Sequence, residues 1–105
     1  MNRFDVVRNS DAASQRQMPY LLIVQSDLLV DFPTRVVVPL IRQKGAGSAP
    51  ASLLNPRFDI DGETLVMFTQ QIAGLPKRYL GKLVCSLEAQ RNTIIRALDF
   101  LFDGI

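Results

Sequence analysis

The sequence predicts a single, mostly β domain in which about five to seven short antiparallel strands are followed by one C-terminal helix. The chain has 105 residues, the length of one domain, and 48% of them are hydrophobic against 21% charged. Short apolar runs separated by turn residues fill most of the chain, and helical periodicity is confined to residues 86–105. Strands followed by a terminal helix are typical of an antiparallel sheet or small barrel on which the helix packs.

The first half of the chain carries three predicted strands. Residues 3–7 alternate between apolar and polar side chains, which predicts a half-buried strand, and the polar residues 9–19 predict a loop. Residues 20–24 form a continuous β-prone apolar run, as a central strand does. Residues 35–40 are rich in valine and predict a third strand. Because Pro39 has no N–H to donate to a ladder, we expect it at a sheet edge or a bulge.

A hairpin is predicted in the second half of the chain. Residues 43–52 are rich in Gly, Ser and Pro and predict a mobile surface loop. Residues 58–60 and 64–69 flank Asp61-Gly62, and this dipeptide is a strong hairpin signal because both residues tolerate positive φ.

A turn and a last strand follow the hairpin. Gly74 and Pro76 predict a turn over residues 70–77, and residues 78–84 predict a short final strand.

The terminal helix is predicted from its cap and its periodicity. Ser86 is the expected N-cap, with Leu87 opening the helix and Glu88 in the first turn, where the helix dipole favours an anion. Gly104 is the expected left-handed residue that ends the helix. An apolar stripe at helical spacing faces the predicted core, and it comprises Leu87, Ile94, Leu98, Leu101 and Ile105, widened by Ile95 and Phe102.

The composition removes several classes of enzyme. The chain has no histidine, which excludes Ser-His-Asp and Cys-His nucleophiles and imidazole acid–base chemistry. The lone Cys85 cannot form an internal disulfide or a thiolate zinc site. No Gly-rich phosphate loop in a strand–loop–helix context is present. We therefore expect a binding protein without a metal ion or cofactor, and not an enzyme.

The charge pattern and the absence of long apolar runs point to a cytoplasmic protein. The net charge is +2, and the basic residues are spread along the chain. A nucleic-acid binder usually gathers its Lys and Arg on one face, so we expect no specific nucleic-acid binding. No run of about 18 apolar residues predicts a membrane span, and the N-terminus lacks the apolar stretch of a signal peptide. A lone cysteine fits a reducing compartment.

Two pairs of residues have side chains that the stability of the fold alone does not favour at their positions. Asp99 and Asp103 are four residues apart at the end of the predicted helix, where like charges repel by a few tenths of a kcal/mol and the dipole prefers cations. They are either plain exposed carboxylates, with Arg96 beside Asp99, or an acidic patch for a basic partner. Leu28 and Leu29 are apolar where polar residues are expected, unless at least one faces the core.

Two segments of the chain resemble the CcdB family of bacterial toxins. Residues 24–29 read Val-Gln-Ser-Asp-Leu-Leu and are followed by Pro33, Arg35, Val37 and Pro39-Leu40. Residues 94–105 end in Phe-Asp-Gly-Ile and are similar to the family's C-terminal helix and tail. Residues 61–76 are similar in order and spacing, so the resemblance covers nearly the whole chain as one CcdB-like domain over residues 1–105.

The resemblance implies a fold, an activity and partners. It implies a small SH3-like barrel of the CcdB/MazF type with a C-terminal helix, assembled as a homodimer. It implies a non-enzymatic toxin of a toxin–antitoxin pair that binds the A subunit of DNA gyrase and traps the cleaved-DNA complex. It also implies a cognate CcdA-like antitoxin that removes the toxin from gyrase and with it represses their own operon.

The resemblance also implies which residues contact gyrase. In the family's pattern an asparagine stands where this chain has Asp99, and a tryptophan stands where it has Asp103. An aspartate in place of that stacking anchor still offers an ion pair to an arginine of gyrase. Carried over by position, the expected gyrase-binding residues are Leu28, Leu29, Asp99, Asp103, Gly104 and Ile105.

Two alternatives remain open from the sequence. One is a ribonuclease toxin similar to MazF, for which Arg35, Arg57 and Thr69 are available without a marked spacing. The other is a decayed homologue that binds antitoxin without harming gyrase, suggested by the departures at Asp99 and Asp103. By analogy, the antitoxin contacts the loops near Arg8 and residues 43–52.

Overall fold

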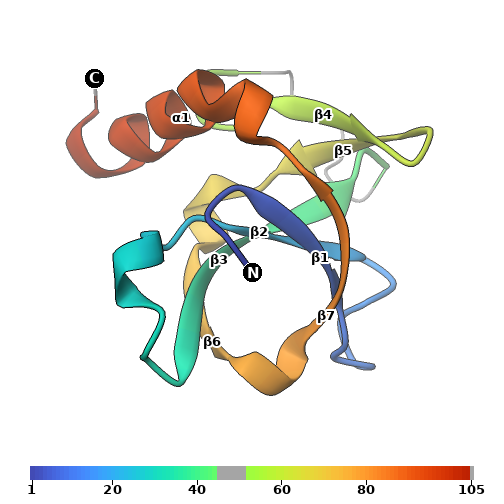
Figure 1. Cartoon of the computed structure of the whole chain (residues 1–105). Helices are drawn as coiled ribbons and strands as arrows, with labels where there is room; N and C mark the ends of the chain where they lie inside the picture. The colour runs from blue at the N-terminus through green and yellow to red at the C-terminus, as the bar shows by residue number, and fades with distance from the viewer. Residues whose placement is uncertain (45–51, 105) are drawn as a thin grey trace.

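A computed structural model of the chain describes residues 1–44 and 52–104, which form one strongly curved antiparallel sheet and a C-terminal helix (Figure 1). The seven strands pair in the order β4-β5-β3-β2-β1-β7, with β6 also paired to β3. Every pairing is antiparallel, so the predicted mostly β fold is confirmed. The elements are β1 (Asp5–Asn9), β2 (Tyr20–Ile23), η1 (Asp27–Leu29), β3 (Thr34–Arg42), β4 (Arg57–Ile60), β5 (Glu63–Met67), η2 (Thr69–Gln71), β6 (Ala73–Pro76), η3 (Lys77–Tyr79), β7 (Leu80–Ser86), η4 (Glu88–Gln90) and α1 (Arg91–Asp103).

Strand β3 is the centre of the sheet. Along one side it pairs with β2, and along the other it pairs first with β6 and then with β5. Pro39 lies between these last two partners, and its carbonyl accepts a 3.0 Å hydrogen bond from the N–H of Phe68. Pro39, which has no N–H, therefore lies in the gap between the part of β3 that pairs with β6 and the part that pairs with β5. The expected edge or bulge position was wrong because this gap accommodates a proline within a central strand.

The hairpin prediction is confirmed and the turn prediction is not. Asp61 and Gly62 join β4 to β5 with φ values of 52° and 75°, as a tight hairpin turn requires. The predicted turn over residues 70–77 contains β6, in which Gly74 and Pro76 pair with β3. A short strand paired to β3 tolerates both residues because a proline needs no ladder bond on an unpaired side.

Both faces of the sheet are buried where it curves. The larger core lies between the sheet and α1, and the smaller core lies inside the ring that β1, β2, β3, β6 and β7 form in Figure 1. Val6 belongs to the larger core and Val7 to the smaller, because successive strand residues point to opposite faces. Strand β1 is therefore buried on both faces, and not half-buried as predicted. It also begins at Asp5, two residues later than predicted.

Helix α1 begins later than predicted. Strand β7 continues to Ser86, and η4 precedes the helix, so Leu87 and Glu88 are outside α1. The Oγ of Ser86 does accept a 3.2 Å hydrogen bond from the N–H of Glu88, but it caps η4. Gly104 ends α1 with φ 72°, as predicted.

The apolar stripe of α1 is confirmed only in part. Ile94 and Leu98 are buried against the sheet. Phe102 was expected in the stripe, yet 68% of its surface is exposed. The last turn of α1 extends past the sheet at the left of Figure 1, where the sheet no longer covers the helix. Ile105 and residues 45–51 of the predicted mobile loop are outside the described residues.

None of the helices in the described ranges is long and apolar enough to cross a membrane.

Candidate partner-binding surface

The loop that contains η1 presents apolar side chains to solvent. Leu28 is 92% exposed and Leu29 is 43% exposed, and Val30 and Phe32 are about half exposed. The alternative that Leu28 or Leu29 faces the core is therefore wrong. Four large apolar side chains exposed within one short loop are typical of a surface that binds another protein.

Local hydrogen bonds shape the backbone of this loop. The Oγ of Ser26 accepts a 3.2 Å hydrogen bond from the N–H of Leu28, and its carbonyl accepts a 3.1 Å bond from the N–H of Leu29. The carbonyl of Leu29 in turn accepts a 3.4 Å bond from the N–H of Phe32. A serine directly before the turn favours this conformation because its hydroxyl accepts from the backbone two residues later. The sequence Ser-Asp-Leu-Leu therefore folds into η1 with its leucines outward.

Buried side chains hold the same loop from below. The side chain of Gln25 donates from Nε2 to the carbonyl of Leu29 at 2.9 Å and accepts at Oε1 from the N–H of Val36 at 3.0 Å. The guanidinium of Arg35 donates to the carbonyl oxygens of Val30 and Phe32, between η1 and β3, and of Thr34, the first residue of β3. The side chains of the loop are thus exposed to solvent, while hydrogen bonds from Gln25 and Arg35 hold its backbone.

The end of α1 provides a second exposed segment. Asp99, Asp103 and Gly104 are exposed, as are the rings of Phe100 and Phe102. Within residues 1–44 and 52–104, ion pairs join Arg42 to Glu63 and Arg91 to Glu88, and none involves either aspartate of α1. The expected help of Arg96 for Asp99 is therefore not found, and both carboxylates are available to a partner.

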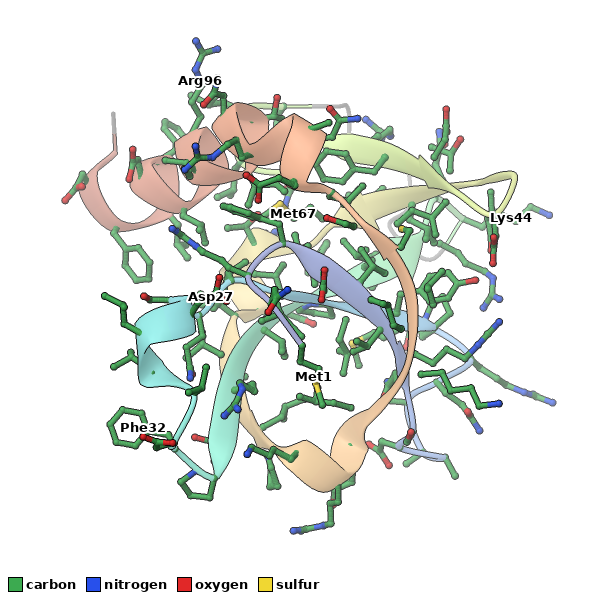
Figure 2. The ribbon with its side chains drawn as sticks, viewed as in Figure 1. Met1, Asp27, Phe32, Lys44, Met67 and Arg96 are labelled. Carbon is green, nitrogen blue, oxygen red and sulfur yellow. The ribbon has the colours of Figure 1, made fainter. Side chains whose placement is uncertain are left out.

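The two segments lie on the same side of the molecule. In Figure 1, η1 and the C-terminal end of α1 both lie at the left edge, and Figure 2 shows Phe32 there with its ring pointing outward. We call the exposed side chains of residues 27–32 and 99–104 the η1–α1 surface. It combines apolar groups with the carboxylates of Asp27, Asp31, Asp99 and Asp103. It unites five of the six expected contact residues, since Ile105 is not described.

Sequence reasoning did not predict four apolar and two acidic members of the η1–α1 surface, namely Val30, Phe32, Phe100, Phe102, Asp27 and Asp31. Phe32 carried a usable signal, because an aromatic residue between Asp31 and Pro33 lies in a turn and turns are exposed. The position of Phe102 was misleading, because its helical spacing matched the apolar stripe and predicted a buried side chain.

The three residues considered for ribonuclease chemistry, Arg35, Arg57 and Thr69, do not form a shared site on the surface. Thr69 is fully buried, and its Oγ1 donates a 2.6 Å hydrogen bond to the carbonyl of Leu54. Arg35 is occupied by loop carbonyls. Arg57 lies on β4, away from the η1 loop in Figure 1. Among the described residues, no three His, Cys, Asp or Glu side chains lie close enough to hold a metal ion.

Arginines gather on another part of the molecule. Arg8, Arg16 and Arg42 line one surface hollow, and Arg42 also borders a second hollow with Lys44. Figure 2 shows Lys44 on the opposite side of the molecule from Phe32. The basic residues are therefore less scattered in the fold than along the chain.

The fold and the η1–α1 surface define a small β domain that presents apolar side chains and carboxylates on a hydrogen-bonded loop and at a helix end, a combination typical of protein-binding domains. The family model described as "CcdB protein" matches residues 3–104. The chain therefore belongs to the CcdB family. It is a gyrase-poisoning toxin of a toxin–antitoxin system and acts without enzymatic chemistry.

Proposed function

We propose that the η1–α1 surface binds the A subunit of DNA gyrase and stabilises the gyrase complex in which the DNA is cleaved. The observation that carries this proposal is the exposure of Leu28 on a loop whose backbone is held by Gln25 and Arg35. Burying a leucine side chain in a partner contributes about 1.5–3 kcal/mol. An apolar anchor on a prearranged loop loses little of that energy to ordering.

The carboxylates of α1 supply the polar part of the proposed contact. Asp99 and Asp103 have no ion pair within the described residues, and both stand at the negative end of the helix dipole. A guanidinium of gyrase placed there forms charge-assisted hydrogen bonds with either one. Asp103 thus replaces the family's stacking tryptophan by an ion pair.

A homodimer would present this surface twice. Gyrase is a two-fold assembly, and a toxin with its own two-fold axis places two η1–α1 surfaces in equivalent positions. We propose this dimer in the cytoplasm, where gyrase acts.

The arginine hollow is the surface we propose for the CcdA-like antitoxin. Arg8, Arg16 and Arg42 fit an acidic segment, and the first of these lies near the loop expected to contact the antitoxin. Binding there should weaken as salt is raised, because exposed ion pairs are screened.

A DNA cleavage assay with purified gyrase, ATP and the untagged protein tests the proposed function. We expect linear, gyrase-linked DNA to accumulate with the wild-type protein. Unchanged gyrase activity at high protein excess would contradict poisoning by this chain. If the protein still dimerises and binds an antitoxin under those conditions, it is the decayed homologue.

A further inference from the structure

Arg35 is a buried cation at the start of β3. Only 7% of its surface is exposed. Its Nη1 donates to the carbonyl oxygens of Phe32 at 2.6 Å and Thr34 at 2.9 Å, and its Nη2 donates to the carbonyl of Val30 at 2.7 Å. One side chain therefore makes three short charge-assisted bonds, two to the segment between η1 and β3 and one to the first residue of β3.

The charge of Arg35 is balanced by backbone dipoles. Within the described ranges, the ion pairs within 4.0 Å are Arg42–Glu63 and Arg91–Glu88, so no carboxylate pairs with Arg35. Burying a cation without a carboxylate costs desolvation free energy. If the side chain at position 35 only filled space, an apolar residue would avoid this cost. A guanidinium, however, offers five N–H donors in a rigid fork and can hold several carbonyls at once.

The carbonyls that Arg35 holds belong to the residues that face solvent. Val30 and Phe32 expose their side chains on the η1–α1 surface while the guanidinium holds their carbonyls from the interior. Gln25 does the same for Leu29 and also binds the N–H of Val36 on β3. Side chains from below therefore hold the carbonyls of Leu29, Val30 and Phe32, three of the four exposed residues from 29 to 32.

We propose that Arg35 is a positioning residue, which holds the η1 loop in its binding conformation without itself contacting the partner. This role rests on the proposed function of the η1–α1 surface. Holding the loop before binding lowers the entropy lost on association. If Arg35 is shortened, water can replace it at the loop carbonyls, whereas β3 keeps its backbone pairing with β2 and β6.

The test compares Arg35→Lys with Arg42→Lys. Both arginines lie on β3, but Arg42 is exposed and pairs with Glu63 at 2.7 Å at the other end of the strand. Hydrogen exchange is measured at the amides of Leu29 and Phe32, which are bonded within the loop, and at that of Val24, which is bonded to β3. We expect Arg35→Lys to speed exchange at the two loop amides by about tenfold or more and to leave Val24 unchanged. Arg42→Lys should change none of them.

A double-mutant cycle then links the loop to binding. Affinity for purified gyrase is measured for Leu28→Ala in the wild-type and in the Arg35→Lys backgrounds. We expect Leu28→Ala to weaken binding by about fivefold or more in the wild type, and by less than about twofold once the loop is released. A residue that only supports the fold would leave the effect of Leu28→Ala unchanged.

The two readouts separate the possible outcomes. Unchanged loop exchange in Arg35→Lys overturns the proposal whatever gyrase does. Faster loop exchange combined with additive effects on affinity also overturns it. If the wild-type protein does not bind gyrase while Arg35→Lys loosens the loop, the proposed function fails and the holding role of Arg35 stands.

A second variant covers a failure of Arg35→Lys to fold. Gln25→Glu keeps the acceptor for the N–H of Val36 and removes the donor to the carbonyl of Leu29. We expect this variant to speed exchange at the loop amides and to show the same loss of the Leu28 effect. Wild-type exchange and wild-type affinity in this variant would count against a prearranged loop.

Discussion

The main-chain N–H of Arg3 donates a 2.7 Å hydrogen bond to Oδ1 of Asp27, which ties the start of the chain to η1. The Nε of Arg3 adds a 3.1 Å bond to the carbonyl of Val24. Arg3 therefore holds Asp27, the first residue of the exposed loop, although the two residues are 24 positions apart in the sequence.

Asp27→Ala should destabilise the protein by about 0.5–1.5 kcal/mol, because it removes the acceptor of the Arg3 N–H. Asp27→Asn keeps an oxygen at that position and should stay close to wild type. Urea unfolding measures both. The matched control is Asp31→Ala, an exposed carboxylate on the same loop, and a loss there equal to that of Asp27→Ala would contradict the role of the Arg3 bond.

Three glycine substitutions should rank in a definite order. Gly81→Ala should cost most, because its Cβ would lie 2.8 Å from the Oγ of Ser10 and 2.9 Å from the carbonyl oxygen of Arg8. Gly62→Ala meets open space but has φ +75°, so it should cost about 1–2 kcal/mol in strain. Gly74→Ala has neither obstacle and should be neutral or slightly stabilising. Free energies of unfolding from urea titration check the order, and a Gly74→Ala protein as unstable as Gly62→Ala would refute it.

Asp103→Lys should abolish toxicity while thermal stability stays the same or rises. Reversing the charge removes the proposed partner for an arginine of gyrase, and a cation near the helix C-terminus contributes about 0.3–1 kcal/mol. Growth arrest on expression and a thermal melt measure the two effects. Asp59→Lys, an exposed aspartate on β4, is the control that should remain toxic. A toxic, well-folded Asp103→Lys protein would remove this residue from the site.

Leu28→Ala should impair gyrase poisoning without loss of stability. Leu28 is 92% exposed, so its removal leaves no cavity in the core. The matched control is Leu83→Ala on β7, where the leucine is 64% exposed and lies outside the η1–α1 surface. The cleavage assay should separate the two variants by about fivefold or more in the concentration that gives half-maximal linear DNA. Equal potency of the two variants would contradict a specific role for η1.

Cys85 should react slowly with iodoacetamide in the folded protein. Burial raises the pKa of the Cys85 thiol above its ordinary value, and the negative charges of Asp61 and Asp5 raise it further. The thiolate is the reactive form, so unfolding in urea should speed alkylation at pH 8. Alkylation as fast in the folded protein as in urea would contradict this.

The same pKa shift predicts an alkaline loss of stability. As pH rises past about 8.5, the unfolded thiol ionises before the folded one, so the free energy of unfolding falls until the folded thiol ionises too. Below the unfolded pKa this contribution is constant. Cys85→Ser should flatten this part of the stability profile, and an unchanged slope would assign it to other groups.

Local backbone demands explain which elements were predicted correctly. The Asp61-Gly62 hairpin and the Gly104 helix end both depend on positive φ at particular residues, a property that belongs to the residue itself. Strand β6 was missed because Gly74 and Pro76 have no strand preference of their own, and their pairing with β3 makes them a strand. Helix α1 was predicted to begin too early because the end of β7 is set by its pairing with β1, up to Ser86.

The site shows the same division between local pattern and tertiary contact. The sequence by itself determined the mostly β class, the hairpin, the helix end and the unusual pairs Leu28-Leu29 and Asp99/Asp103, because each rests on neighbouring residues or on helical spacing. Only the tertiary structure decided that Phe102 overhangs the sheet, because periodicity defines a face of a helix but not where its packing partner ends. Only the tertiary structure, too, brought Arg35 under the η1 loop, because a buried guanidinium is directed by the carbonyls that surround it in space.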